Sequence, residues 1–102
     1  MYHRALDLDP EMAAARDNLS ILLAGKGRYE EAIAEARRAV ELEPWNAATR
    51  GNLAAAYCGC GQLDEGIREY RAAIEIDPGN RRLQSGLERA YISRGSRRES
   101  LP

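Results

Sequence analysis

Apolar residues recur along the chain with the spacing of an amphipathic helix, most clearly between Tyr29 and Pro44. In this stretch they follow the i, i+1, i+4, i+7, i+8 pattern that places side chains on one helical face: Ala32, Ile33, Ala36, Ala39 and Val40. Acidic residues open the stretch and Arg37 and Arg38 lie in its second half, an order that complements the helix dipole. The pattern predicts a helix from Tyr29 to Leu42.

The same pattern returns at one fixed spacing. Landmarks 34 residues apart are the acidic-proline pairs, a glycine and a leucine: Pro10, Pro44 and Pro78; Gly27, Gly61 and Gly95; Leu19, Leu53 and Leu87. A period between 20 and 50 residues is typical of a stacked array whose units are each too small to bury their own apolar face. We therefore predict an all-α repeat protein.

These residues resemble the tetratricopeptide repeat family, in which each unit is an antiparallel pair of helices, A and B, closed by a proline. Residues 13–46 and 47–80 match as full repeats. The family's packing places are held in the first by Leu19, Leu23, Ala32, Ala36, Ala39 and Pro44, and in the second by Leu53, Tyr57, Gly66, Tyr70, Ala73 and Pro78. The resemblance implies an α-solenoid, a superhelix of antiparallel helix pairs with about six helices.

The flanking segments correspond to parts of a repeat. Residues 1–12 match the end of an incomplete repeat, its helix B only, and residues 81–95 match helix A of a further repeat or a capping helix. Residues 96–102 are expected to be a flexible tail, because they have no apolar periodicity. Since the incomplete repeat at residues 1–12 lacks its helix A, we expect the chain to be a fragment of a larger protein.

Helix ends follow from local signals. We expect helices over residues 2–9, 11–25, 29–42, 47–59, 64–76 and 81–94, broken by glycine after each helix A. The expected N-caps are Asn46, Asp64 and Asn80. One departure from the family recurs: a place in helix A that usually holds an aromatic residue holds Arg16, Arg50 and Gln84. We expect this departure to loosen the stack.

Composition supports a small helical protein. The 102 residues allow one domain, and the 44% hydrophobic content includes no Phe, which suits close helix packing better than a β-sandwich. The net charge of −1 gives no overall attraction to nucleic acid or anionic membrane. No apolar run reaches the ~18 residues needed to span a bilayer, so we expect a soluble, cytoplasmic protein without membrane contact.

Candidate catalytic chemistry is sparse. His3 is the single histidine and has no nucleophile partner in the sequence. Cys58 and Cys60 form a C-x-C pair, but two helical steps place them on nearly opposite faces, so we interpret them as packing residues with reduced thiols. No Gly-rich phosphate loop follows a strand. We predict a non-enzyme that needs no cofactor or metal.

Function is then expected on the concave side of the solenoid, which helix A of each unit lines in the family. The resemblance implies a groove that binds a peptide segment of a partner protein, with these contacting residues: Asp17, Asn18, Ile21, Asn52, Ala55, Arg82, Ser85 and Arg89. Asn18 and Asn52 repeat among small residues, and a carboxamide can pair with any peptide backbone. Because Arg82 and Arg89 lie at one end, the segment is expected to be acidic there.

Some family members hold the carboxyl terminus of heat-shock chaperones with a carboxylate clamp. Asn52 and Arg82 match that set, but Asp17, Ile21 and Gly86 do not. An anionic residue where a cation is required repels a terminal carboxylate. We do not expect this version of peptide binding.

Three alternatives remain. Residues 81–102 carry six Arg and two Glu, so this end could contact nucleic acid or another polyanion through Arg81, Arg82, Arg89, Arg94, Arg97 and Arg98. The chain could be a regulatory repeat module of an enzyme. It could also self-associate head to tail, with Tyr2 and Leu6 of one molecule packing on Leu83, Leu87 and Tyr91 of the next.

Overall fold

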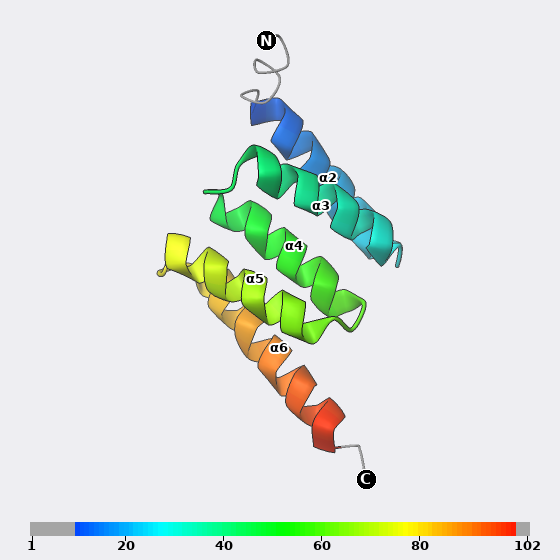
Figure 1. Cartoon of the computed structure of the whole chain (residues 1–102), viewed down its shortest axis with the longest axis vertical. Helices are drawn as coiled ribbons and strands as arrows, with labels where there is room; N and C mark the ends of the chain where they lie inside the picture. Colours follow the sequence, from blue (N-terminus) through cyan, green and yellow to red (C-terminus); the bar gives the residue numbers. More distant parts are fainter. Residues whose placement is uncertain (1–9, 100–102) are drawn as a thin grey trace.

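The computed structural model describes residues 10–99, which form five helices joined by short turns (Figure 1). They are α2 (Pro10–Gly25), α3 (Tyr29–Leu42), α4 (Ala47–Gly59), α5 (Leu63–Ile76) and α6 (Arg81–Glu99). No strand occurs within residues 10–99, so the predicted all-α class is confirmed. The helix expected over residues 2–9 lies outside the described residues.

The helices form a two-layered array. α2 packs against α3 and α4 packs against α5, and contacts of α3 with α4 and of α5 with α6 join these pairs. α4 also touches both α2 and α6. Figure 1 shows α3 lying over α2 and α5 lying over α6, with α4 between the two pairs. α2, α4 and α6 therefore form one row of neighbours, as the predicted solenoid requires.

The turns that connect α2 to α3 and α4 to α5 have the same geometry. Gly27 and Gly61 have φ angles of 80° and 90°, in the left-handed region that favours glycine. The N–H of the next residue donates back into the preceding helix, from Arg28 to the Leu23 carbonyl and from Gln62 to the Tyr57 carbonyl, at 2.9 Å each. These bonds satisfy helix-end carbonyls and reverse the chain within three residues.

The third glycine of the series behaves differently. Gly95 does not have a positive φ, and α6 continues past it to Glu99. The expected helix end near Arg94 was therefore wrong, and residues 96–99 are helical, while residues 100–102 lie outside the described part. A glycine inside a helix costs only about 1 kcal/mol, so without a left-handed conformation it does not end the helix.

Two of the three expected N-caps are confirmed. The Asn46 side chain accepts from the Thr49 N–H at 3.2 Å, and the Asn80 side chain accepts from the N–H groups of Arg82 and Leu83 at 3.0 and 3.3 Å. Asp64 is not a cap. α5 begins at Leu63, so Asp64 lies inside the first turn. Its carboxylate accepts a hydrogen bond from Arg94 Nη1 at 2.8 Å and does not cap the helix.

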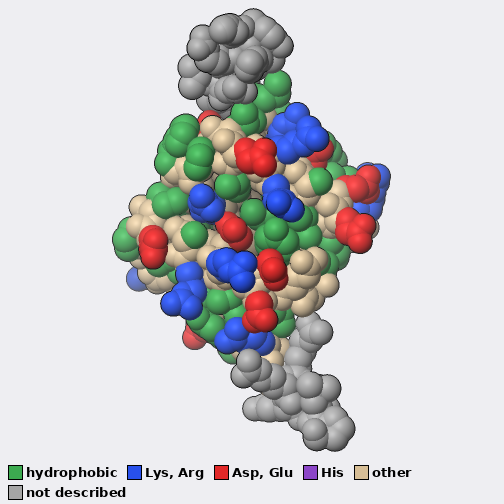
Figure 2. All heavy atoms as spheres, viewed as in Figure 1, with side chains coloured by type: hydrophobic (Ala, Val, Ile, Leu, Met, Phe, Trp, Pro, Cys, Tyr) green, Lys and Arg blue, Asp and Glu red, His purple; other side chains and the backbone are tan. Residues whose placement is uncertain are grey.

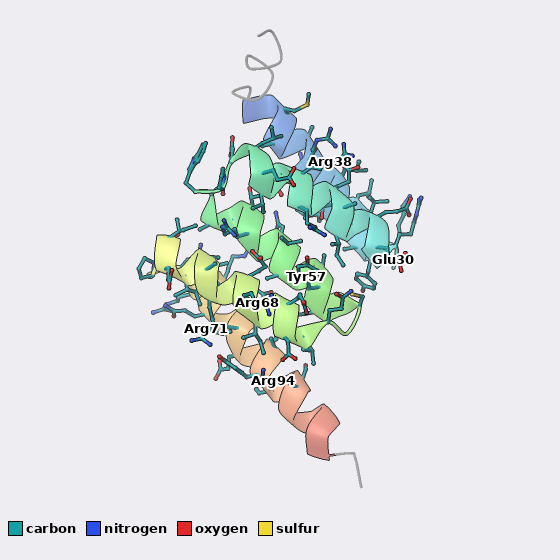
Figure 3. All side chains as sticks on the ribbon, in the orientation of Figure 1. Glu30, Arg38, Tyr57, Arg68, Arg71 and Arg94 are labelled. Atoms are coloured by element: carbon teal, nitrogen blue, oxygen red, sulfur yellow. The ribbon has the colours of Figure 1, made fainter. Side chains whose placement is uncertain are left out.

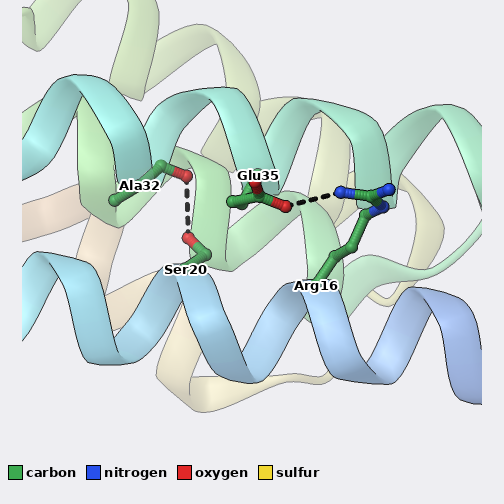
Figure 4. Close-up of polar contacts among 4 residues, drawn as sticks. All are labelled: Arg16, Ser20, Ala32 and Glu35. Atoms are coloured by element: carbon green, nitrogen blue, oxygen red, sulfur yellow. Dashed lines mark hydrogen bonds and ion pairs between the residues drawn. The ribbon is translucent and has the colours of Figure 1, made fainter.

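Ion pairs occupy the place where the family usually has an aromatic residue. Arg16 Nη1 lies 2.7 Å from Glu35 Oε1, between α2 and α3 (Figure 4), and Arg50 Nη1 lies 3.1 Å from Glu69 Oε1, between α4 and α5. These side chains are about three-quarters buried. The structure thus shows a repeated polar link between the helices of each pair where we expected only a lost packing residue.

Small residues let the two helices of each pair approach closely. Between α2 and α3, Ser20 is 1% exposed and its hydroxyl donates to the Ala32 carbonyl at 3.0 Å (Figure 4). Between α4 and α5, the equivalent residues are Ala54 and Gly66. A Cβ on Gly66 would lie 3.0 Å from the Ala54 carbonyl oxygen and would overlap Cys58 Sγ. The second crossing therefore requires glycine because Cys58 is larger than its counterpart Ala24.

We predict that Gly66→Ala lowers the free energy of unfolding by about 1–2 kcal/mol, because overpacking at the crossing exceeds the gain in helix propensity. Cys58→Ala in the same chain should restore most of the loss, since the first repeat tolerates Ala24 with Ala32 at these places. Urea unfolding followed by circular dichroism measures the change.

The matched control is Gly25→Ala, since a Cβ there meets nothing within 4 Å. It should leave stability unchanged or raise it slightly. Equal stability of the Gly66→Ala variant and the wild type would contradict this account of the crossing.

Candidate functional site

A groove runs between α4 and α6, and its floor comes from α5. The first of its two adjoining hollows is lined by Ala48, Gly51, Asn52, Ala55, Tyr70, Asn80, Arg81, Arg82, Leu83, Ser85 and Arg89. The second is lined by Ala55, Cys58, Gly59, Gly61, Leu63, Tyr70, Gly86, Arg89, Ala90 and Ser93. Five of the eight residues proposed from the sequence meet in the first hollow: Asn52, Ala55, Arg82, Ser85 and Arg89.

The two walls of the groove have different chemistry. On α6, Arg82, Ser85 and Arg89 follow the i, i+3, i+7 spacing that aligns side chains along one helical face over about 10 Å. On α4, Asn52 is half-buried, and its side chain makes no hydrogen bond to another described residue. Its carboxamide therefore keeps both a donor and an acceptor available toward the groove.

The first hollow is strongly cationic. Three arginines line it and no aspartate or glutamate does, although the whole chain has a net charge of −1. Arg82 and Arg89 form no ion pair within the described residues. The face seen in Figure 2, over α3 and α5, instead mixes basic and acidic side chains. Positive charge is thus concentrated on the groove and is balanced on the outer face.

Tyr70 is a groove residue that the sequence analysis missed, because we assigned it to packing between helices. Its ring extends from α5 to the groove floor, where it lies against Gly86 of α6. A Cβ on Gly86 would be 2.6 Å from the Tyr70 hydroxyl oxygen, so the missing side chain makes room for the ring. The sequence signal that could have indicated this role is Gly86, a glycine inside the helix that packs against Tyr70.

The pKa of Tyr70 is raised above its usual range. Burial is the main cause, because it disfavours the phenolate, and the neighbouring Cys58 adds to it. Arg89 and Arg82 oppose the shift, which places both guanidinium groups within electrostatic reach of the ring. The phenol therefore remains protonated at neutral pH and can donate a hydrogen bond.

Asp17, which we expected in the groove, instead links two helices. Its Oδ2 accepts a hydrogen bond from Thr49 Oγ1 at 2.8 Å, between α2 and α4, and Thr49 is fully buried. Asp17 Oδ1 is buried without a partner among the described residues. This carboxylate therefore links α2 to α4 within the inner row of helices.

Asn18 and Ile21 lie on α2 beyond the two hollows and are exposed, Ile21 at 54%. Asn18 makes no hydrogen bond within the described residues. Ile21 is accompanied by two more exposed apolar residues of the same helix, Leu19 and Leu22. The structure thus separates the three proposed residues of α2 from the five that meet between α4 and α6.

Part of the α6 surface that was expected to receive a second molecule is already packed within the chain. Leu83 is 5% exposed and Leu87 is half-buried, both packed against residues of α4 and α5. Tyr91 remains exposed, but the Arg94 guanidinium lies 5.3 Å from its ring centroid. Tyr2 and Leu6, the other half of the expected contact, lie outside the described residues.

The two cysteines are free thiols with separate surroundings. Burial raises the pKa of the half-buried Cys58 thiol, and Cys60 adds to the shift while Arg89 opposes it. Cys60 follows the end of α4, and its thiol donates to the Tyr57 carbonyl at 3.3 Å.

Among the described residues no group of His, Cys, Asp and Glu is placed to hold a metal ion. None of the described helices has the length and apolarity to cross a membrane.

The sequence matches the tetratricopeptide repeat family model over residues 23–90, which is more than half of the chain. The chain belongs to the tetratricopeptide repeat family. No characterised protein sequence matches it closely. The match includes α4, α5 and every groove-lining residue of α6 except Ser93, so nearly all of the groove lies within the matched repeats.

Solved structures agree with the fold. The second tetratricopeptide domain of Spaghetti (RPAP3), bound to the HSP90 peptide SRMEEVD, is 21% identical, with a TM-score of 0.80 over 90% of this chain and 85% of that chain. A mutant O-GlcNAc transferase from Thermobaculum terrenum is 34% identical, with a TM-score of 0.76 over 85% of this chain. The chain corresponds to only 17% of that enzyme.

We predict that Thr49→Val lowers the free energy of unfolding by about 1–3 kcal/mol, because it leaves a buried carboxylate without its donor while preserving side-chain shape. In a chain that already carries Asp17→Ala, the same change should cost much less. Chemical unfolding of the two single variants and the double variant measures their coupling energy. A coupling energy near zero would mean that the Thr49–Asp17 hydrogen bond does not stabilise the array.

Proposed function

We propose that this chain is a protein-interaction scaffold that binds an extended acidic segment of a partner protein in the groove between α4 and α6. The observation that carries the proposal is the lining of that groove, which contains three arginines and no acidic residue in a chain of net charge −1. A cationic groove attracts an anionic segment and speeds its association.

Hydrogen bonding supports an extended segment. The free carboxamide of Asn52 can pair with a peptide N–H and C=O whatever the side chains of the segment are. Small residues beside it, Ala48 and Ala55, leave room for a peptide backbone to approach α4. Asn52 would thus supply affinity that does not depend on the partner's sequence, and the arginines would select for acidic residues.

The structurally similar Spaghetti domain binds a peptide with two glutamates and an aspartate, SRMEEVD. In this chain the places that would hold a terminal carboxylate contain Asp17 and Ile21, and Asp17 is engaged with Thr49. The proposed ligand is therefore recognised through acidic side chains within a segment rather than through a free carboxyl terminus.

Two other functions receive less support. The α6 arginines whose side chains are described do not share one surface, because Arg82 and Arg89 line the groove whereas Arg94 pairs with Asp64. The nearby aromatic residue Tyr91 lies under Arg94 and not beside the groove.

A role as the repeat module of an enzyme fits the partial match to a glycosyltransferase, and it would use the same binding groove. Head-to-tail association also receives less support, since Leu83 and Leu87 are already packed within the chain.

We predict that the double variant Arg82→Glu with Arg89→Glu binds acidic segments at least about tenfold more weakly, because attraction becomes repulsion at two places. The probe is a fluorescein-labelled heptapeptide with three glutamates and with blocked termini, compared with its glutamine counterpart by fluorescence anisotropy. Wild-type affinity should fall with added salt, and the variant should lose this dependence.

The matched control is Arg37→Glu with Arg71→Glu, two exposed arginines of the outer helices α3 and α5; Arg71 is labelled in Figure 3. This control makes the same charge change and should reduce binding only slightly. An equal loss in both double variants would show that net charge alone attracts the peptide and would contradict a groove-specific function.

A further inference from the structure

Tyr70 links the outer layer of helices to the groove. It lies on α5, which packs behind α4 and α6, and its ring reaches between them to the groove floor. At the equivalent place in α3 the chain has Ala36, which is fully buried. A phenol on the groove floor is therefore a feature of the second described helix pair and is missing from the first.

The hydroxyl group of Tyr70 is available to a ligand. The side chain is 7% exposed, and its hydroxyl makes no hydrogen bond to another described residue. It is nevertheless not sealed, because within residues 12–95, for which burial is described, Asp17 Oδ1 is the one side-chain nitrogen or oxygen that is both buried and unpartnered. A polar group held at a concave surface without a protein partner is placed to bind something that enters the groove.

Three residues line both hollows: Ala55, Tyr70 and Arg89. The two hollows therefore meet where Ala55 of α4, Tyr70 of α5 and Arg89 of α6 come together. Arg89 forms no ion pair with a described residue. The meeting point thus combines a neutral hydroxyl donor with a permanent cation, and no carboxylate competes for either.

We propose that the Tyr70 hydroxyl and the Arg89 guanidinium together hold one aspartate or glutamate side chain of the bound segment at this point. The inference rests on the proposed function and adds the residue that selects where along the segment the acidic group lies. A carboxylate has two oxygens, so one can accept from the phenol while the other accepts from the guanidinium. A neutral amide side chain could use only one oxygen as acceptor there.

The test is Tyr70→Phe, measured with the blocked three-glutamate heptapeptide and a set in which each glutamate is changed singly to glutamine. The variant keeps the ring against Gly86 and removes only the hydroxyl. We expect about tenfold weaker binding of the parent peptide, the loss of one hydrogen bond to a charged group. For one glutamine peptide the difference in affinity between wild type and variant should be clearly the smallest, because its missing carboxylate is the one that Tyr70 holds.

The matched control is Tyr57→Phe, which removes a hydroxyl from a half-buried tyrosine of α4 that packs toward α3 (Figure 3). It should leave affinity unchanged, and both variants should keep the wild-type melting temperature within a few degrees. A heptapeptide carrying phosphoserine in place of the selected glutamate distinguishes the class of anion. Tighter binding of the phosphopeptide that still depends on the hydroxyl would overturn a carboxylate site in favour of a phosphate site.

The outcomes separate the two claims. If wild type binds the acidic peptide and Tyr70→Phe binds it equally well, the Tyr70 assignment is wrong while the groove function survives. If no blocked acidic peptide binds wild type at all, the proposed function itself fails. If all single glutamine peptides lose the same affinity in Tyr70→Phe, the hydroxyl does not act at one acidic residue and the inference is overturned.

Discussion

Close contact between the helices of each pair is the constraint on which the rest of this structure depends. Ser20 with Ala32 and Ala54 with Gly66 bring helical backbones so near that a hydroxyl reaches a carbonyl at one crossing and a single Cβ cannot be added at the other. Larger residues here would separate the layers. With the layers in contact, a side chain from α5 can pass between α4 and α6 and form part of the opposite surface.

The groove follows from a second set of small residues, those between neighbouring inner helices. A Cβ on Gly51 would meet the Leu83 side chain, and a Cβ on Gly86 would meet Tyr70, so the first glycine allows α6 to approach α4 and the second allows α6 to approach α5. The groove between α4 and α6 has a carboxamide on one wall and arginines on the other. Its chemistry is set by a few polar residues, because Ala48, Gly51, Ala55 and Gly86 contribute lining without hydrogen-bonding side chains.

Much of the fold could be predicted from the sequence, because its signals are local. The ends of α3 and α4 match their predicted residues, since glycine turns, proline and Asn46 act within a few positions of each helix end. The candidate groove residues of α4 and α6 came instead from the resemblance to the family, which assigns them by their place in the 34-residue repeat. The roles of Asp17 and Tyr70 were not found, because each depends on a partner in another helix, Thr49 and Gly86. The pairing of Arg16 with Glu35 was also missed, although both residues recur after one period as Arg50 and Glu69.

The central claim is that binding occurs on the inner groove and not on the outer face. Amide NMR spectra of the ¹⁵N-labelled chain, recorded while the blocked three-glutamate heptapeptide is added, test it most directly. The account predicts that the largest shifts occur at the Asn52 side-chain amide and at the backbone amides of Ala55, Ser85 and Arg89, with the Asn18 side-chain amide changing little. Shifts that are largest on the outer residues of α3 and α5, such as Arg37 and Arg71, would contradict it.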